Sequence, residues 1–134
     1  MKELLLTIDV LLDEVYEVNG KHGEVIMILF HGSCTGDYFE GTILSGGVDT
    51  QIQKQGKDKC LSARYMLEGK DYTGHPCRIY IENNGTVKGQ EDITAYPVIY
   101  TDSESLQWIE EIPLVSTVEG KGDSRVEIRI YGER

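Results

Sequence analysis

Hydrophobic and polar residues alternate with a period of two along most of this chain, which is the spacing of β-strands with one buried and one solvated face. In the first segment, about residues 3–12, one face is entirely aliphatic and consists of Leu4, Leu6, Ile8, Val10 and Leu12. The last segment, 125–131, alternates apolar and charged residues in the same way. Asn19-Gly20 and Asn84-Gly85 separate such segments, and this pair is typical of tight hairpin turns because both residue types tolerate positive φ. The pattern predicts many short antiparallel strands.

Two segments depart from simple alternation. Residues 24–30 are apolar on both faces, which indicates a strand covered from two sides, inside a packed barrel or beneath another subunit. Near 103–110 the spacing predicts one short helix, which either Asp102 or Ser103 can cap. The apolar residues of this helix are three apart: Leu106, Ile109 and Ile112.

About eight to ten strands are expected in these 134 residues, and no long helix separates them. A chain of this length fits one domain, so residues 1–134 are expected to form a single domain. Antiparallel strands without crossover helices build a sandwich or a barrel, and closure into a barrel removes the exposed edges that promote aggregation. We therefore predict an all-β fold, a single closed or nearly closed antiparallel β-barrel with one short helix.

The composition of the chain argues against several classes of binding partner. Thirteen basic and twenty-three acidic residues give a formal net charge of -10, and this field repels nucleic-acid phosphates and anionic lipid surfaces. No segment approaches the roughly 18 to 20 apolar residues needed to cross a bilayer. The three cysteines, Cys34, Cys60 and Cys77, form no Cys-x-x-Cys pair, which argues against a disulfide framework. We expect a cytoplasmic protein that binds neither nucleic acid nor membranes.

Two motifs resemble reactive sites only formally. Residues 32–36 have the spacing of a nucleophile elbow with cysteine at its centre, but that motif requires a following helix, and residues 37–41 do not start one. His31 and Cys34 are close in sequence, yet the other histidines and cysteines lie in separate turns or strands, whereas a structural zinc site needs four ligands. We therefore expect no metal and no cofactor.

The glycine pair Gly46-Gly47 and the acid Asp49 do not follow from strand patterning, and they mark a candidate site. Glycines let the backbone turn sharply and approach a ligand, which leaves the Asp49 carboxylate facing the mouth of a barrel. An aspartate that caps a turn explains the same residues without a ligand. Both interpretations stay open.

Arg64, Tyr80 and Glu82 are the other polar candidates, and each lies on a predicted strand. Neighbouring residues of a strand point to opposite faces, so Arg64 is either a solvated surface charge or a lumen cation paired with Asp49, Asp9 or Glu82. Tyr80 and Glu82 share a polar strand face, which lines either the cavity or the solvent.

Segments 41–49, 63–65 and 79–85 carry Gly-x-x-Leu-x-Gly-Gly-x-Asp, Ala-Arg-Tyr, and Ile-Tyr-Ile with a following glycine. In these segments the chain resembles the domain of unknown function 3237 family of small bacterial and fungal proteins. A later pattern of that family is similar to Pro97, Thr101 and Trp108. The chain departs from the family at Thr50, where a tryptophan is usual, and in a longer loop at 69–76. The resemblance implies a single antiparallel β-barrel, broadly like the calycin barrels, and implies no established activity.

The leading hypothesis is a barrel that binds a small, partly apolar molecule in its cavity or mouth. The residues expected to bind it are Asp49, Arg64, Tyr80 and Glu82, with Gly46 and Gly47 shaping the turn. The first alternative is a cofactor-independent enzyme of the isomerase, cyclase or decarboxylase type, which acts on a small carbonyl or phenolic compound. The second is a structural or assembly module that forms a homo-oligomer without a ligand.

Overall fold

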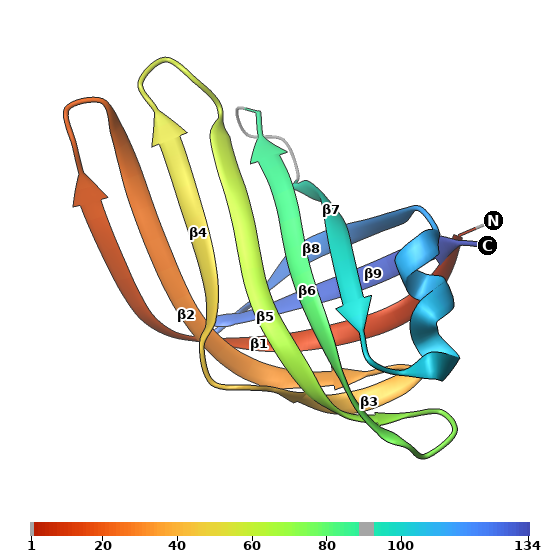
Figure 1. Cartoon of the computed structure of the whole chain (residues 1–134). Helices are drawn as coiled ribbons and strands as arrows, with labels where there is room; N and C mark the ends of the chain where they lie inside the picture. The colour runs from red at the N-terminus through yellow and green to blue at the C-terminus, as the bar shows by residue number, and fades with distance from the viewer. Residues whose placement is uncertain (1, 89–92) are drawn as a thin grey trace.

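The computed structural model describes residues 2–88 and 93–134, which form one antiparallel sheet and one short helix (Figure 1). The nine strands of this part of the chain are β1 (Lys2–Asn19), β2 (Gly23–Thr35), β3 (Phe39–Ile43), β4 (Gly47–Lys54), β5 (Lys59–Asp71), β6 (Pro76–Val87), β7 (Thr94–Thr101), β8 (Leu114–Gly122) and β9 (Arg125–Glu133). The helix, η1 (Glu104–Glu111), is a 3-10 helix between β7 and β8. The predicted all-β class, strand number and short helix are confirmed. None of the described residues belongs to a helix long and apolar enough to cross a membrane.

The strand pairings close the sheet into a ring. β1 pairs with both β2 and β9, and the order continues from β9 through β8, β7 and β6 to β5. β5 returns to β2 through two short strands, because β3 and β4 each pair with both β2 and β5. The seam between β7 and β8 is short, with Thr94 paired to Thr117 and Ala95 paired to Ser116. Closure gives the ring an inside and an outside, and the alternation along each strand assigns every side chain to one of them.

Apolar side chains fill the inside of the ring at the end near η1. β1 contributes Leu6 and Ile8, and β9 contributes Ile130, all of them 0% exposed. Leu106 and Ile109 of η1 add two more buried side chains. This helix lies beside the two chain termini, away from the hairpins that join β1 to β2 and β4 to β5 (Figure 1). Since full burial of one such side chain contributes about 1.5–3 kcal/mol, this end of the ring is the stable part of the fold.

The described part of this chain does not cover residues 24–30 on both faces, so the predicted cover inside a packed barrel is wrong, whereas cover by another subunit stays a prediction. Phe30 is 5% exposed, but Met27 is 40% exposed. The long β1–β2 hairpin extends beyond the packed core, and Tyr16 and Val18 on its outer part are 55% and 60% exposed. Only the part of β2 near Phe30 therefore reaches the core.

Asp71, at the end of β5, joins the β5–β6 turn to the start of η1. Its Oδ1 accepts hydrogen bonds from the Thr73 hydroxyl at 2.5 Å and from the backbone N–H groups of Thr73 and His75. Its Oδ2 accepts one from the Ser103 hydroxyl at 2.8 Å. These bonds, that of the Thr73 side chain foremost, lower the pKa of Asp71 to about 2. Ser103 precedes η1 as predicted, but its side chain binds Asp71 and makes no capping bond to the helix.

Candidate functional site

The inside of the ring holds a cavity of about 220 Å³ on the side of the core away from η1. Of the described residues that line it, eleven are apolar, and they include Val10 and Leu12 from β1 and Val126 and Ile128 from β9. Three polar residues share the lining: Asp49, Gln51 and Asn83. A mostly apolar wall with a few convergent polar groups is the usual composition of a small-molecule site.

Strand register explains why these polar residues meet. Asp49 on β4 pairs with Ala63 on β5, and Ala63 pairs with Asn83 on β6, so the three residues form one rung across three strands. On its other side Asp49 pairs with Ile28 of β2. Directly paired residues point to the same face of a sheet, and Gln51, two positions further along β4, points there as well.

The Asp49 carboxylate is the least satisfied polar group of the cavity. Its Oδ2 accepts a hydrogen bond from Gln51 Nε2 at 2.9 Å. Its Oδ1 is buried, and no described residue donates a hydrogen bond to it. Burial raises the pKa of Asp49 above its ordinary value, and the Gln51 hydrogen bond opposes this shift. Asp49 lies within β4 and caps no turn among the described residues, so the turn-capping interpretation is wrong.

Asn83 is held in place by the strand on the far side of the short seam. Its Oδ1 accepts a hydrogen bond from Ser116 Oγ at 2.9 Å, and the same hydroxyl lies 3.4 Å from the carbonyl oxygen of Ala95. Asn83 and Ser116 are 4% and 0% exposed. This contact links β6 to β8 across β7, and it fixes one wall of the cavity.

The cavity continues toward the rim of the ring at the β4–β5 hairpin. A second hollow, of about 340 Å³, shares Gln51, Leu61 and Ile93 with it. The other described residues that line the rim hollow are Gln53, Asp58, Lys59 and Val87. In the register, Gln53 pairs with Lys59 and Lys59 pairs with Val87, so these three form the rung nearest the hairpin. The inner cavity and the rim hollow are therefore consecutive parts of one inner surface.

The predicted site residues do not converge, which corrects the sequence-based grouping. Arg64 pairs with Val48 and Glu82, and Tyr80 pairs with Met66, so all three candidates from β5 and β6 lie on the outer face. Arg64 Nε lies 2.8 Å from Glu82 Oε1, and the two side chains are 62% and 25% exposed. Arg64 is therefore a surface cation with a surface partner, and Asp49 faces the cavity without it.

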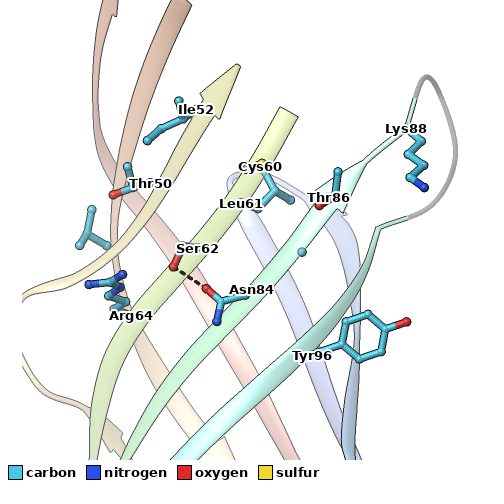
Figure 2. A pocket seen from close by; sticks show the side chains of 12 residues that line it. Thr50, Ile52, Cys60, Leu61, Ser62, Arg64, Asn84, Thr86, Lys88 and Tyr96 are labelled. Atoms are coloured by element: carbon cyan, nitrogen blue, oxygen red, sulfur yellow. Dashed lines mark hydrogen bonds between the residues drawn. The ribbon is translucent and has the colours of Figure 1, made fainter. Parts of the chain in front are cut away.

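Figure 2 shows the outer face of β4 to β7, where an open hollow of about 1270 Å³ is lined by hydroxyl, amide and apolar side chains and by the basic residues Arg64 and Lys88. Ser62 Oγ donates a hydrogen bond to Asn84 Oδ1 at 2.8 Å, drawn as the dashed line in Figure 2. Tyr96 and Ile52 at its borders are 63% and 40% exposed. The polar groups of this outer hollow are thus solvated or paired with one another, unlike Asp49 Oδ1.

Gly46 and Gly47 lie at the turn that leads into β4. Gly46 has a φ of +110°, a conformation that favours glycine. Gly47 pairs with Phe30, and a Cβ at this position would lie 3.1 Å from the Phe30 ring. The Phe30 ring in turn packs edge-on against Tyr65, with the ring centroids 5.4 Å apart. The missing side chain of Gly47 therefore leaves room for the Phe30 ring, which lines the cavity together with Asp49.

The cysteine and histidine motif is not a reactive site. Cys34 is 2% exposed, and burial raises the pKa of its thiol to about 12, which keeps it protonated. His31 is on the outside, with Nδ1 2.8 Å from Asp13 Oδ1. Among residues 2–88 and 93–134, no cluster of three histidine, cysteine or acidic side chains has the arrangement of a metal site.

Sequence reasoning missed Gln51, Asn83 and Lys59 as inner polar residues. Gln51 lies two residues after Asp49 on the same strand, so their side chains are expected to point to the same face of the sheet. The faces of Asn83 and Lys59 follow only from the pairing of β5 with β4 and β6. Pairing between strands is not contained in the alternation of any single strand.

Comparison with known proteins gives a family match. The model of a family described as "Protein of unknown function (DUF3237)" matches residues 2–96. A UPF0311 protein of Clostridium acetobutylicum is 43% identical over 58 residues, which make up 42% of this chain and 34% of that protein. The match therefore spans about a third of the length of this curated relative.

Solved structures share the fold. A protein of unknown function from Clostridium acetobutylicum is 24% identical with a TM-score of 0.83, covering 100% of this chain and 99% of that one. A β-barrel-like protein from Acinetobacter baumannii is 21% identical with a TM-score of 0.80, covering 98% and 94%. An enzyme from Penicillium herquei is 15% identical with a TM-score of 0.75, covering 99% and 94%. At these identities the likeness establishes the fold.

Proposed function

We propose that this chain, which belongs to the DUF3237 family of proteins of unknown function, binds a small, mainly apolar molecule inside its ring. In this proposal the apolar walls enclose the body of the ligand, and Asp49 accepts a hydrogen bond from a hydroxyl or amine of the ligand. Arg64, Tyr80 and Glu82 take no part, because they lie on the outer face.

The observation that carries the proposal is the buried Asp49 Oδ1, to which no described residue donates a hydrogen bond. A buried acceptor without a partner costs about 1–3 kcal/mol, and more when the group is charged. A ligand that brings a donor to this oxygen removes that cost and gains a charge-assisted hydrogen bond. Binding affinity is therefore expected to depend strongly on one oxygen atom.

Cavity size restricts the ligand. The volume of about 220 Å³ is below the range of about 300–1,000 Å³ that is typical for drug-sized ligands. Ligands with a single ring, or a short aliphatic chain with one donor, suit the inner cavity. A larger molecule must extend into the rim hollow.

A second candidate function is catalysis without a cofactor, of the isomerase or cyclase type. The raised pKa of Asp49 favours it, because a carboxyl group that titrates nearer to neutral pH is a better acid or base for a bound carbonyl or phenol. A structural neighbour from Penicillium herquei is described as an enzyme. The two functions share the cavity and differ in whether the ligand leaves changed.

A ligand screen tests both functions. Small monocyclic phenols, alcohols, amines and carbonyl compounds are screened by thermal shift and ligand-observed NMR against the wild type, Asp49→Asn and Ala63→Leu. Asp49→Asn removes the charge at constant shape, and Ala63→Leu fills the cavity. Arg64→Gln is the matched control on the outer face of the same strand as Ala63.

We expect hits whose Kd rises about tenfold or more in Asp49→Asn, which is about 1.4 kcal/mol, and which Ala63→Leu no longer binds. Arg64→Gln should bind them like the wild type. Equal affinity in the wild type and Asp49→Asn would remove the proposed role of Asp49. NMR of each hit over time then separates the functions, because a ligand that stays unchanged at saturating protein excludes catalysis on that ligand.

A further inference from the structure

We infer that the ligand of this cavity is an amphiphilic acid, whose donor group meets Asp49 and whose carboxylate is bound by Lys59 at the rim. The inference rests on the proposed function and names its ligand class. The juxtaposition that supports it is an inner wall with the Asp49 carboxylate at its base, whose Oδ1 has no hydrogen-bond donor among the described residues, and with the Lys59 ammonium group at its mouth, which has no ion-pair partner among them.

Strand register places Lys59 on the same inner surface as Asp49. From the rim inward, the rungs across β4, β5 and β6 are Gln53–Lys59–Val87, Gln51–Leu61–Gly85 and Asp49–Ala63–Asn83. Lys59 and Ala63 are four residues apart on β5, which corresponds to about 13 Å along the strand. The flexible lysine side chain shortens this span, so a ligand with one ring and a short acidic chain can reach both groups.

The two hollows give a reason for a ligand with two different ends. Among the described residues, eleven apolar side chains line the inner cavity, whereas the seven that line the rim hollow include Gln53, Asp58 and Lys59. A molecule too long for the inner cavity leaves it past Gln51 and Leu61, which line both hollows. The outer end of such a molecule therefore meets polar and charged side chains. A polar or charged group at that end is favoured, because an apolar group there would stay exposed to water.

Lys59 is available to bind an anion. It is half-buried, and no described carboxylate lies within ion-pair distance of its ammonium group. Among the described residues that line the two hollows, Lys59 is the one basic residue. Lys54 and Lys57, on the same hairpin, line a different hollow with His22 and Val25. Of the three lysines near this hairpin, Lys59 is therefore the one that can contact a cavity ligand.

Asp58 opposes an acidic ligand at the same rim, since it lines the hollow beside Lys59. The effect of charge on ligand affinity can therefore be tested by removing either the negative or the positive charge at the rim. Asp58→Asn should strengthen binding of a carboxylate, and Lys59→Gln should weaken it. Neither change should alter binding of an uncharged ligand of the same shape.

The experiment uses three matched probes: para-hydroxyphenylpropanoate, its methyl ester, and phenylpropanoate without the hydroxyl. Their Kd values are measured by calorimetry or NMR for the wild type and for five variants: Lys59→Gln, Asp58→Asn, Asp49→Asn, Ala63→Leu and Lys54→Gln. Lys54→Gln is the matched control, because it removes the same charge from the outward face of the same hairpin. Circular dichroism and melting temperature check that each variant is folded.

For the wild type, the ester and the phenyl compound should each bind about tenfold more weakly than the hydroxy acid. Lys59→Gln should abolish the difference between acid and ester and keep the effect of the hydroxyl. Asp49→Asn should abolish the effect of the hydroxyl and keep the difference between acid and ester. Lys54→Gln should bind all three probes like the wild type. Added salt should weaken binding of the acid more than that of the ester.

Equal binding of acid and ester by the wild type would overturn the inference, and so would equal losses in Lys59→Gln and Lys54→Gln. If the hydroxyl effect still depends on Asp49 in that case, the proposed function stands. If none of the three probes binds while other small apolar molecules occupy the cavity, the acidic ligand class is wrong. If Ala63→Leu leaves binding of every probe unchanged, the proposed cavity function fails as well.

Discussion

Asp49 and Arg64 point to opposite faces of the sheet, although they lie on adjacent strands and differ by one step in the register. Asp49 pairs with Ala63, whereas Arg64 pairs with Val48. The Asp49 carboxylate is consequently enclosed with apolar side chains, and the Arg64 guanidinium meets Glu82 at the surface. One residue of register thus separates an inner acid, whose Oδ1 has no hydrogen-bond donor among the described residues, from an outer ion pair.

Arg64→Gln should change the free energy of unfolding only slightly. It removes a solvent-exposed ion pair with Glu82, and such pairs contribute about 1 kcal/mol or less. Urea denaturation of the wild type, Arg64→Gln, Glu82→Gln and the double variant measures the coupling. A loss of several kcal/mol, or a change in the affinity of a cavity ligand, would contradict the outer placement of Arg64.

Asp49→Asn should stabilise the ligand-free protein near neutral pH. Burial raises the pKa of Asp49 in the folded state, so its contribution to stability is greatest at low pH and falls as the pH rises through that pKa. The variant should therefore melt a few degrees above the wild type at pH 7 and at nearly the same temperature at pH 3. The opposite order at pH 7 would mean that the ionised carboxylate is stabilised by the fold.

Asp71→Asn should destabilise the protein at pH 7. Ionised Asp71 accepts hydrogen bonds from Thr73, His75 and Ser103, and its pKa is lowered to about 2. Its contribution is therefore complete above the ordinary pKa of an aspartate, about 3.9, and is lost as the pH falls toward 2. Melting curves at pH 7 and below pH 3 should show a smaller difference between variant and wild type at the lower pH.

Ser103→Ala gives an independent check of the same contacts. It removes the hydroxyl donor to Asp71 Oδ2 and should cost about 1 kcal/mol. NMR titration of the Asp71 carboxyl should show a higher pKa in this variant than in the wild type. An unchanged Asp71 pKa would contradict the assigned contact.

Gly46→Ala and Gly47→Ala should both destabilise the fold, for different reasons. Gly46 has open space around a Cβ but a φ of +110°, so alanine there costs about 1–3 kcal/mol in backbone strain. A Cβ on Gly47 would press against the Phe30 ring at 3.1 Å, and overpacking of this kind costs about 1–3 kcal/mol. Adding Phe30→Leu should offset part of the second loss and none of the first, as chemical denaturation of the double variants would show.

Parts of the fold and of the site could be predicted from the sequence alone. The aliphatic face of residues 4–12 and the turn at Asn19-Gly20 indicate β1 and its hairpin, because side-chain alternation is a local property. The same pair at Asn84-Gly85 makes no turn but lies within β6, paired to β5 and β7, so the predicted second hairpin turn is wrong. The helix at Glu104–Glu111 follows from local spacing as well. Asp49 and the glycine pair were identified because they break the strand pattern. The ring of paired strands and the seam closed by Ser116 and Asn83 are non-local, and local spacing does not contain them.

By itself, the sequence determined the all-β class, the positions of most strands, and which side chains of one strand share a face. Only the tertiary structure decided which of those faces is inside, and hence that Asp49 and Lys59 line the cavity while Arg64, Tyr80 and Glu82 meet solvent. The physical reason is that alternation fixes the relative orientation of residues within a strand. The absolute orientation depends on which faces the closed ring of long-range pairings encloses.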